Sequence, residues 1–234
     1  MNLFTLMGLS GLLVIYLCIV PALPSFRQTS LRLATSGTLY FLLLGLGFMF
    51  VEISLIQRFS MFLGHPVYGL AVGLFGIILS TGIGSLLSER IRLDSTAKIA
   101  LWSFVLFAYL AALIVWLPSI VRNYEGGVLA VRALVSLCAI APLGALMGFG
   151  FPTGMRLVNA IDSRPTPWFW AVNGAAGVLA ASMAVVTSIV FSINVSLWFG
   201  ATCYLLLGPV SLGLTQASWR FARPKEQESL VAAV

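Results

Sequence analysis

Residues 37–57 read Gly37-Thr-Leu-Tyr-Phe-Leu-Leu-Leu-Gly-Leu-Gly-Phe-Met-Phe-Val-Glu52-Ile-Ser-Leu-Ile-Gln57, an apolar run that contains one carboxylate. About 20 apolar residues, each rising about 1.5 Å along a helix, cross the hydrocarbon core of a bilayer. This run is therefore long enough to be a membrane-spanning helix. Its neighbours along the chain decide whether it stands alone or belongs to a bundle.

Further apolar runs of similar length lie on both sides of it, separated by short polar joints that contain Gly and Pro. They predict spans at 3–21, 67–88, 99–118, 131–151, 168–189 and 193–214. The joint near 192–194 is so tight that the last two spans could be divided differently. The first run is too long for a signal peptide and no Lys or Arg precedes it, so we expect it to remain as a span. The sequence predicts an all-α integral membrane bundle of about seven helices over 1–214 and a polar cytoplasmic tail over 215–234.

Composition supports this class. Hydrophobic residues make up 60% of the 234 residues and charged residues only 9%, whereas soluble domains carry about a quarter charged residues. The formal net charge of +6 fits a protein oriented in a bilayer and does not call for a nucleic-acid partner. The cysteines at 18, 138 and 203 lie in apolar runs without paired spacing, so we expect small core residues and neither a disulfide nor a metal site.

The basic residues indicate an orientation. With seven spans, ten of the thirteen Lys and Arg residues fall on one side of the membrane, and only Arg58, Arg122 and Arg132 fall on the other. The positive-inside rule then places the N-terminus outside and the C-terminus in the cytoplasm. We expect the lipid bilayer of a bacterial cytoplasmic membrane as the surroundings, with further copies of the chain or other membrane subunits as partners.

Two regions of the chain align when it is shifted by 101 residues. The run 47–50 lies over 148–151, Pro66 lies over Pro167, and the glycines at 73 and 76 lie over those at 174 and 177. A shift of three spans reverses the orientation of a helix in the membrane, so the pattern indicates an inverted repeat of spans 2–4 and 5–7, an arrangement common in secondary transporters. The alternative is coincidence in a chain rich in Gly and Phe.

Small residues three or four apart predict close helix contacts in several spans. The pairs are Gly69/Gly73, Gly144/Gly148, Gly150/Gly154 and Gly174/Gly177. Lipid tails give helices no hydrophobic reason to associate, so close approach through small residues has to supply contact energy. Such faces suit a compact bundle or a contact with a partner, and they identify no ligand.

Polar residues at membrane depth are the candidates for function. Glu52 needs to face the bundle, carry a proton or find a partner, because a bare carboxylate in hydrocarbon is costly. It is a candidate proton or cation site, and the alternative is a structural group bonded to a neighbouring helix. Gln57 and Arg58 follow five and six residues later, spacings that do not place them directly on its face.

Three further residues have both a functional and a structural interpretation. Asn173 could bind a ligand or could hydrogen-bond across a helix contact. Pro152 removes an intrahelical hydrogen bond, so span five should break or kink there; broken helices line substrate sites, but kinks near helix ends are also ordinary. His65 is the only histidine, and its Gly-His-Pro setting favours a turn.

Three runs of residues carry a family resemblance. They are Phe50-Val-Glu-Ile-Ser-Leu-Ile-Gln-Arg-Phe59, which continues to Phe62-Leu-Gly-His-Pro-Val-Tyr68, then Met147-Gly-Phe-Gly-Phe-Pro-Thr-Gly-Met-Arg156, and Trp170-Ala-Val-Asn-Gly-Ala175. Together they resemble the membrane region of spermidine-synthase-like transmembrane proteins, over roughly 37–190. Many members of that family join such a transporter-like region to a soluble aminopropyltransferase-like domain.

This sequence contains no segment that could form the soluble domain, so the aminopropyl transfer and its nucleoside substrate are not carried over. The resemblance implies a functional role for Glu52, Gln57 and Arg58 alone. Two functions are then expected: transport of a small or cationic solute, with Glu52 lining the path, or a non-catalytic accessory or scaffolding role in a larger membrane complex. No catalytic set is visible in the sequence, so an enzyme is the least favoured class and no cofactor is expected.

Overall fold

The computed structural model describes residues 30–231, with the backbone alone for 216–231, and a few scattered positions before residue 30. Within these residues all regular structure is helical. The helices are α3 (Leu31–Leu63), α4 (Pro66–Arg90), α5 (Thr96–Tyr124), α6 (Leu129–Met147), α7 (Gly150–Asn159), α8 (Thr166–Val190) and α9 (Ile193–Val231).

Among the described residues, six segments are long and apolar enough to cross a membrane. They are Leu31–Leu63, Pro66–Arg90, Thr96–Tyr124, Leu129–Asn159, Thr166–Val190 and Ile193–Thr215. The prediction of an all-helical chain with apolar spans is confirmed for this part of the protein, which is compatible with a polytopic membrane protein. The predicted span at 3–21 lies outside the residues that the structure describes, so the count of seven spans stays a prediction.

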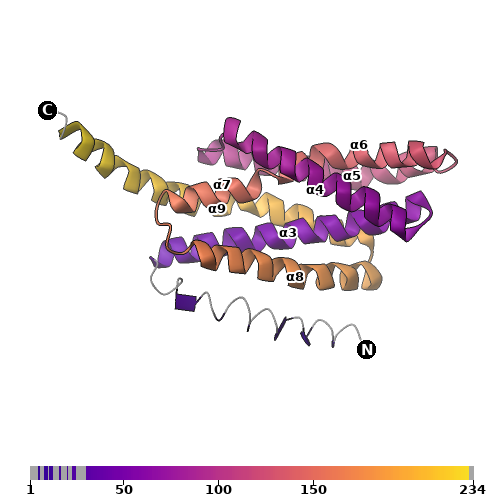
Figure 1. Ribbon diagram of the computed structural model, residues 1–234, viewed down its shortest axis with the longest axis horizontal. Coiled ribbons are helices and arrows are strands. Elements are labelled where there is room, and N and C mark those ends of the chain that lie inside the picture. Colours follow the sequence, from indigo (N-terminus) through magenta and orange to yellow (C-terminus); the bar gives the residue numbers. More distant parts are fainter. Residues whose placement is uncertain are drawn as a thin grey trace.

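Helix α3 is the centre of the bundle. It packs against α4, α8 and α9, while α4 also packs against α6, and α5 against α9. Figure 1 shows α3 between α8 on one side and the layer of α4, α5 and α6 on the other. In the most apolar window of α3, 61% of residues are buried, against 22–44% in the other five spans. Side chains of α3 therefore line the interior of the bundle.

The helix contacts agree with an inverted repeat only in part. In the predicted repeat, α3, α4 and α5 would correspond to α6 with α7, to α8 and to α9. The contact of α3 with α8 would then correspond to the contact of α6 with α4, and both contacts are extensive. The contact of α3 with α4 would correspond to the contact of α7 with α8. The α3–α4 contact is extensive, whereas the α7–α8 contact is slight. The repeat is therefore not confirmed and stays a prediction.

Small residues bring α4 and α6 together. A Cβ added at Gly84 would lie 2.0 Å from the carbonyl oxygen of Ala145, and one added at Gly148 would lie 2.3 Å from the carbonyl oxygen of Thr81. These distances leave no room for a side chain. Gly174 does not make such a close contact, because a Cβ added there would meet nothing within 4 Å.

A tight turn joins α3 to α4. Gly64 has φ of 80°, a left-handed conformation that ends helices and favours glycine. Nδ1 of His65 accepts a hydrogen bond of 3.2 Å from the backbone N–H of Val67, and Pro66 occupies the first helical position. The histidine thus caps α4, which is the turn role that its Gly-His-Pro setting favoured.

Candidate functional site

Glu52 lies inside the bundle. It is 6% exposed, so it does not face lipid. Within the described part of the chain its side chain forms no hydrogen bond or ion pair that would compensate for burial. A carboxylate in this position is expected to bind a proton or another cation, because burial without a counter-charge is costly.

Tyr204 of α9 is a second buried polar group. Its side chain is fully buried, and its hydroxyl has no hydrogen-bond partner among the described residues. The ring lies edge-on to Trp102, with centroids 6.5 Å apart. Tyr204 lies within electrostatic range of both Glu52 and Tyr40. An orphaned buried hydroxyl is unusual, because buried polar atoms nearly always have partners.

Tyr40 links this region to the break between α6 and α7. Its hydroxyl donates a hydrogen bond of 2.9 Å to the carbonyl oxygen of Gly150, the first residue of α7. On the other side of the break, Nε1 of Trp102 donates a bond of 2.8 Å to the carbonyl oxygen of Leu146. Carbonyl groups on both sides of the break are therefore directed at side chains of neighbouring helices.

The break lies just before Pro152. Helix α6 ends at Met147 and α7 begins at Gly150, so residues 148 and 149 form the interruption. Proline has no N–H to donate to the carbonyl four residues earlier, here that of Gly148, and its ring crowds that carbonyl. The helix consequently breaks N-terminal to the proline and restarts with it in the first turn of α7.

We call Glu52, Tyr204, Tyr40 and the Gly150 carbonyl the interior polar cluster. Its members come from α3, α9 and the broken helix, and the bundle core also contains buried serine and threonine hydroxyls, Ser54 and Ser196 among them. A carboxylate can take up and release a proton or hold a cation, and a tyrosine hydroxyl can donate and accept hydrogen bonds. The cluster therefore has the parts of a cation-binding position.

The other residues predicted for the site lie elsewhere. Nη2 of Arg58 donates to Oδ1 of Asn194 at the start of α9, and Oε1 of Gln57 is buried without a partner. Asn173 packs on α3 at Gly45, and its Oδ1 also lacks a partner. Gly45 and Arg58 are thirteen residues apart in one helix, roughly 20 Å at 1.5 Å per residue. The four predicted residues do not form a single site.

Tyr40 and Tyr204 were not predicted from the sequence as candidate site residues. Each stands in an apolar run of the kind that normally supplies core aromatics. A signal was nevertheless present, since a tyrosine at membrane depth carries a hydroxyl that needs a partner. By that criterion, both tyrosines belong with the charged residues among the candidates.

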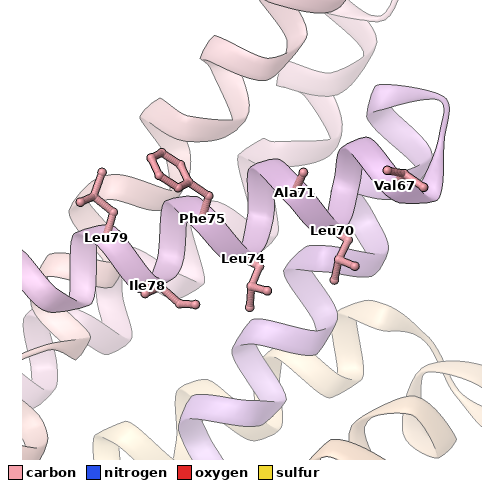
Figure 2. Close-up of a pocket in the computed structure, with 7 residues that line it drawn as sticks. All are labelled: Val67, Leu70, Ala71, Leu74, Phe75, Ile78 and Leu79. Carbon is pink, nitrogen blue, oxygen red and sulfur yellow. The ribbon is translucent and has the colours of Figure 1, made fainter.

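The outer face of α4 carries a shallow apolar groove of about 490 Å³. Figure 2 shows its lining, which comes from one helix alone and comprises Val67, Leu70, Ala71, Leu74, Phe75, Ile78 and Leu79. The spacing of three and four residues places them along one face of the helix. None of these side chains is polar, so the groove offers a contact for lipid or for another helix and no chemistry.

Among the described residues, no group of three His, Cys, Asp or Glu side chains is placed to hold a metal ion. Comparisons of the chain with family models, with curated proteins and with solved structures found no match. The resemblance to spermidine-synthase-like membrane proteins stays a prediction from the three sequence runs.

Proposed function

We propose that this chain is a transporter-like membrane module that moves a small cationic solute or a proton, with Glu52 as the group that binds it. The observation that carries the proposal is the burial of Glu52 inside the bundle, 6% exposed, with no cationic side chain paired to it in the described part of the chain. An ionisable residue held in this way at membrane depth is typically part of an ion or proton pathway.

The broken helix supports the same function. Interrupted spans expose backbone groups within the membrane, and transporters use such groups at binding positions. Here the Gly150 carbonyl at the break connects through Tyr40 to the region of Tyr204 and Glu52. The hydroxyl of Tyr204 has no partner among the residues that the structure describes, so it is available to bond a solute or a water molecule.

We place the module in a bacterial cytoplasmic membrane, with its N-terminus outside, on the strength of its basic residues. We also propose that it is related to the transporter-like region of spermidine-synthase-like membrane proteins. Six or seven spans form a small bundle for a transporter, so assembly from two copies is part of this proposal.

The test is flux through the purified protein in liposomes. A trapped pH-sensitive dye reports protons, and labelled methylammonium and spermidine report organic cations of two sizes. We expect flux in the wild type and at least a tenfold loss in Glu52→Gln, which removes the charge and keeps the shape. Glu89→Gln makes the same chemical change at an exposed residue near the end of α4 and should keep wild-type flux.

Two results would reject the transport proposal. One is a wild-type protein that moves none of these probes; the other is Glu52→Gln with unchanged flux. Elution of each variant as a single species from a size-exclusion column separates loss of flux from loss of the fold.

An accessory role is the second candidate, and the exposed apolar face of α4 favours it. A subunit that holds a neighbouring helix needs such a face, and Phe75 in this groove is 61% exposed. A photo-crosslinking residue placed at position 75 in native membranes should yield an adduct with a second polypeptide if the role is accessory. Adducts with lipid alone would exclude it.

A further inference from the structure

A pocket opens at the end of the bundle where α3 and α5 end and α6 begins. Its volume is about 580 Å³, and its polar lining includes Arg58, Arg122, Arg132 and Glu125. These are the three arginines that the sequence assigns to the sparsely charged side of the membrane. They come from three different helices and converge on one space.

The charge in this pocket is not balanced. Three guanidinium groups and one carboxylate leave two formal positive charges among the lining residues. The ion pairs within the described part of the chain are Lys98 with Asp94 and Arg164 with Asp162, and neither involves the pocket. The three arginines therefore have no anionic partner among the described residues.

Two of the guanidinium groups are held in place by protein atoms. Nη1 of Arg132 donates a hydrogen bond of 3.1 Å to the carbonyl oxygen of Phe62, and Arg58 donates to the side chain of Asn194. The Nε atoms of Arg58 and Arg132 are buried and have no hydrogen-bond partner in the described part of the chain. Each guanidinium carries five N–H donors, so both groups are fixed while most of their donors remain free.

Placement at helix ends accounts for this arrangement only in part. A cation in the last turn of a helix is favoured by the helix dipole, and Arg122 in α5 fits that rule. Arg132 lies in the first turn of α6, but its guanidinium reaches the last turn of α3, where it donates one hydrogen bond to the Phe62 carbonyl oxygen. Its remaining donors are available to an anionic ligand.

We propose that this pocket binds a phosphate group. A phosphate offers several oxygen acceptors and up to two negative charges, and arginine binds such oxygens in a bidentate fashion. The phosphate can belong to a free anion or to a phospholipid headgroup; Met61, which is 66% exposed, provides an apolar wall beside the arginines. The inference is independent of the transport proposal, because Glu52 takes no part in it.

The test measures binding to the purified full chain in a neutral detergent. One arm titrates inorganic phosphate by calorimetry, and the other counts bound phosphatidylglycerol by native mass spectrometry, with phosphatidylcholine as the zwitterionic comparison. We expect retention of phosphate, of phosphatidylglycerol or of both, and at least a tenfold weaker affinity in Arg132→Gln and Arg122→Gln. Arg92→Gln removes the same charge from an exposed position outside the pocket and should bind as the wild type does.

The two arms identify the source of the phosphate. Binding of inorganic phosphate assigns the pocket to a free anion, and binding of phosphatidylglycerol alone assigns it to a lipid. Wild-type protein that prefers neither probe overturns the proposal, and so does an equal loss in Arg92→Gln. If Arg132→Gln fails to fold, Arg122→Gln decides, because Arg122 is exposed and donates no hydrogen bond within the described residues.

Discussion

The phenolic oxygen of Tyr40 lies 2.9 Å from the carbonyl oxygen of Gly150, and this bond joins the central helix to the residue at which the broken helix restarts. Tyr40 is fully buried. A Cβ added at Gly154, one turn further along α7, would lie 2.4 Å from the Tyr40 ring. The hydroxyl and the ring of one side chain therefore both fix the position of α7 after the interruption.

Replacing Tyr40 with Phe removes that hydrogen bond and keeps most of the packing. We expect the free energy of unfolding to fall by about 1 kcal/mol, the usual net contribution of a neutral hydrogen bond. Unfolding of the detergent-solubilised protein by a denaturing detergent measures the change. Tyr124→Phe is the matched control, because Tyr124 is 45% exposed and its hydroxyl has no hydrogen-bond partner in the described structure. An equal effect in both variants would contradict the role assigned to Tyr40.

Tyr204→Phe should separate stability from function. Its hydroxyl is buried and unpaired, and an unsatisfied buried hydroxyl costs about 1–3 kcal/mol. Removing it should leave the free energy of unfolding unchanged or raise it. If the hydroxyl bonds the transported species, the same variant should lose flux by tenfold or more in the liposome assay. Reduced stability with full flux would indicate a structural role instead.

Two glycines in α4 provide a sharp packing test. A Cβ at Gly84 would meet the Ala145 carbonyl at 2.0 Å, whereas a Cβ at Gly82 would meet nothing within 4 Å. Gly84→Ala should therefore lower the free energy of unfolding by about 1–3 kcal/mol, because α4 and α6 have to move apart. Gly82→Ala should be neutral or stabilising by up to about 1 kcal/mol, since alanine favours the helix. Similar stabilities for the two variants would show that this contact is looser than described.

The loop between α7 and α8 contains an ion pair that predicts a pH dependence. The side chain of Arg164 donates hydrogen bonds to the carboxylate of Asp162, the shortest at 2.8 Å. These bonds favour the charged carboxylate and hold the pKa of Asp162 below its usual range. A lowered pKa in the folded state means that the pair stabilises the fold above the unfolded pKa of about 4 and stops doing so as the pH falls through the folded value.

The corresponding experiment replaces Arg164 with Gln and follows the Asp162 carboxyl by NMR. We expect the pKa of Asp162 to rise toward its ordinary value. Lys98→Gln, which breaks the exposed Lys98–Asp94 pair, should leave the pKa of Asp162 unchanged. The effect on stability should be small, because the Arg164 side chain is 67% exposed and exposed pairs contribute little. An unchanged pKa in Arg164→Gln would show that the pair does not persist in solution.

Sequence alone predicted the helical class and the approximate position of the six described spans, because the length of each apolar run can be counted directly along the sequence. It also predicted a break near Pro152 and a turn at His65, features that depend on local covalent geometry. Which helix packs on which, and the depth of each residue in the bundle, depend on contacts between distant segments. For this reason Glu52 was found as a candidate while Tyr204, 152 positions later, was not.

Glu52, Gln57 and Arg58 were predicted as candidates through one shared resemblance, and Asn173 was predicted separately as a polar residue at membrane depth. The structure places Asn173 beside Gly45 and Arg58 beside Asn194, thirteen residues apart along α3. Arg122 and Arg132 were interpreted only as markers of orientation, and Arg58 was not grouped with them. The three arginines converge on one pocket because the ends of three helices lie together. No local sequence pattern predicts that arrangement.

The central position of α3 has a consequence for how the chain is made. It is the first of the described spans to leave the ribosome, yet the helices that enclose it, α8 and α9, are the last. The hydroxyl of Ser54 bonds that of Ser196 at 2.7 Å across 142 positions of sequence. Until α9 is synthesised, the hydroxyl of Ser54 lacks this partner. A ribosome stalled before α9 would therefore leave the part of α3 that carries Ser54 without the helix that covers it in the finished bundle.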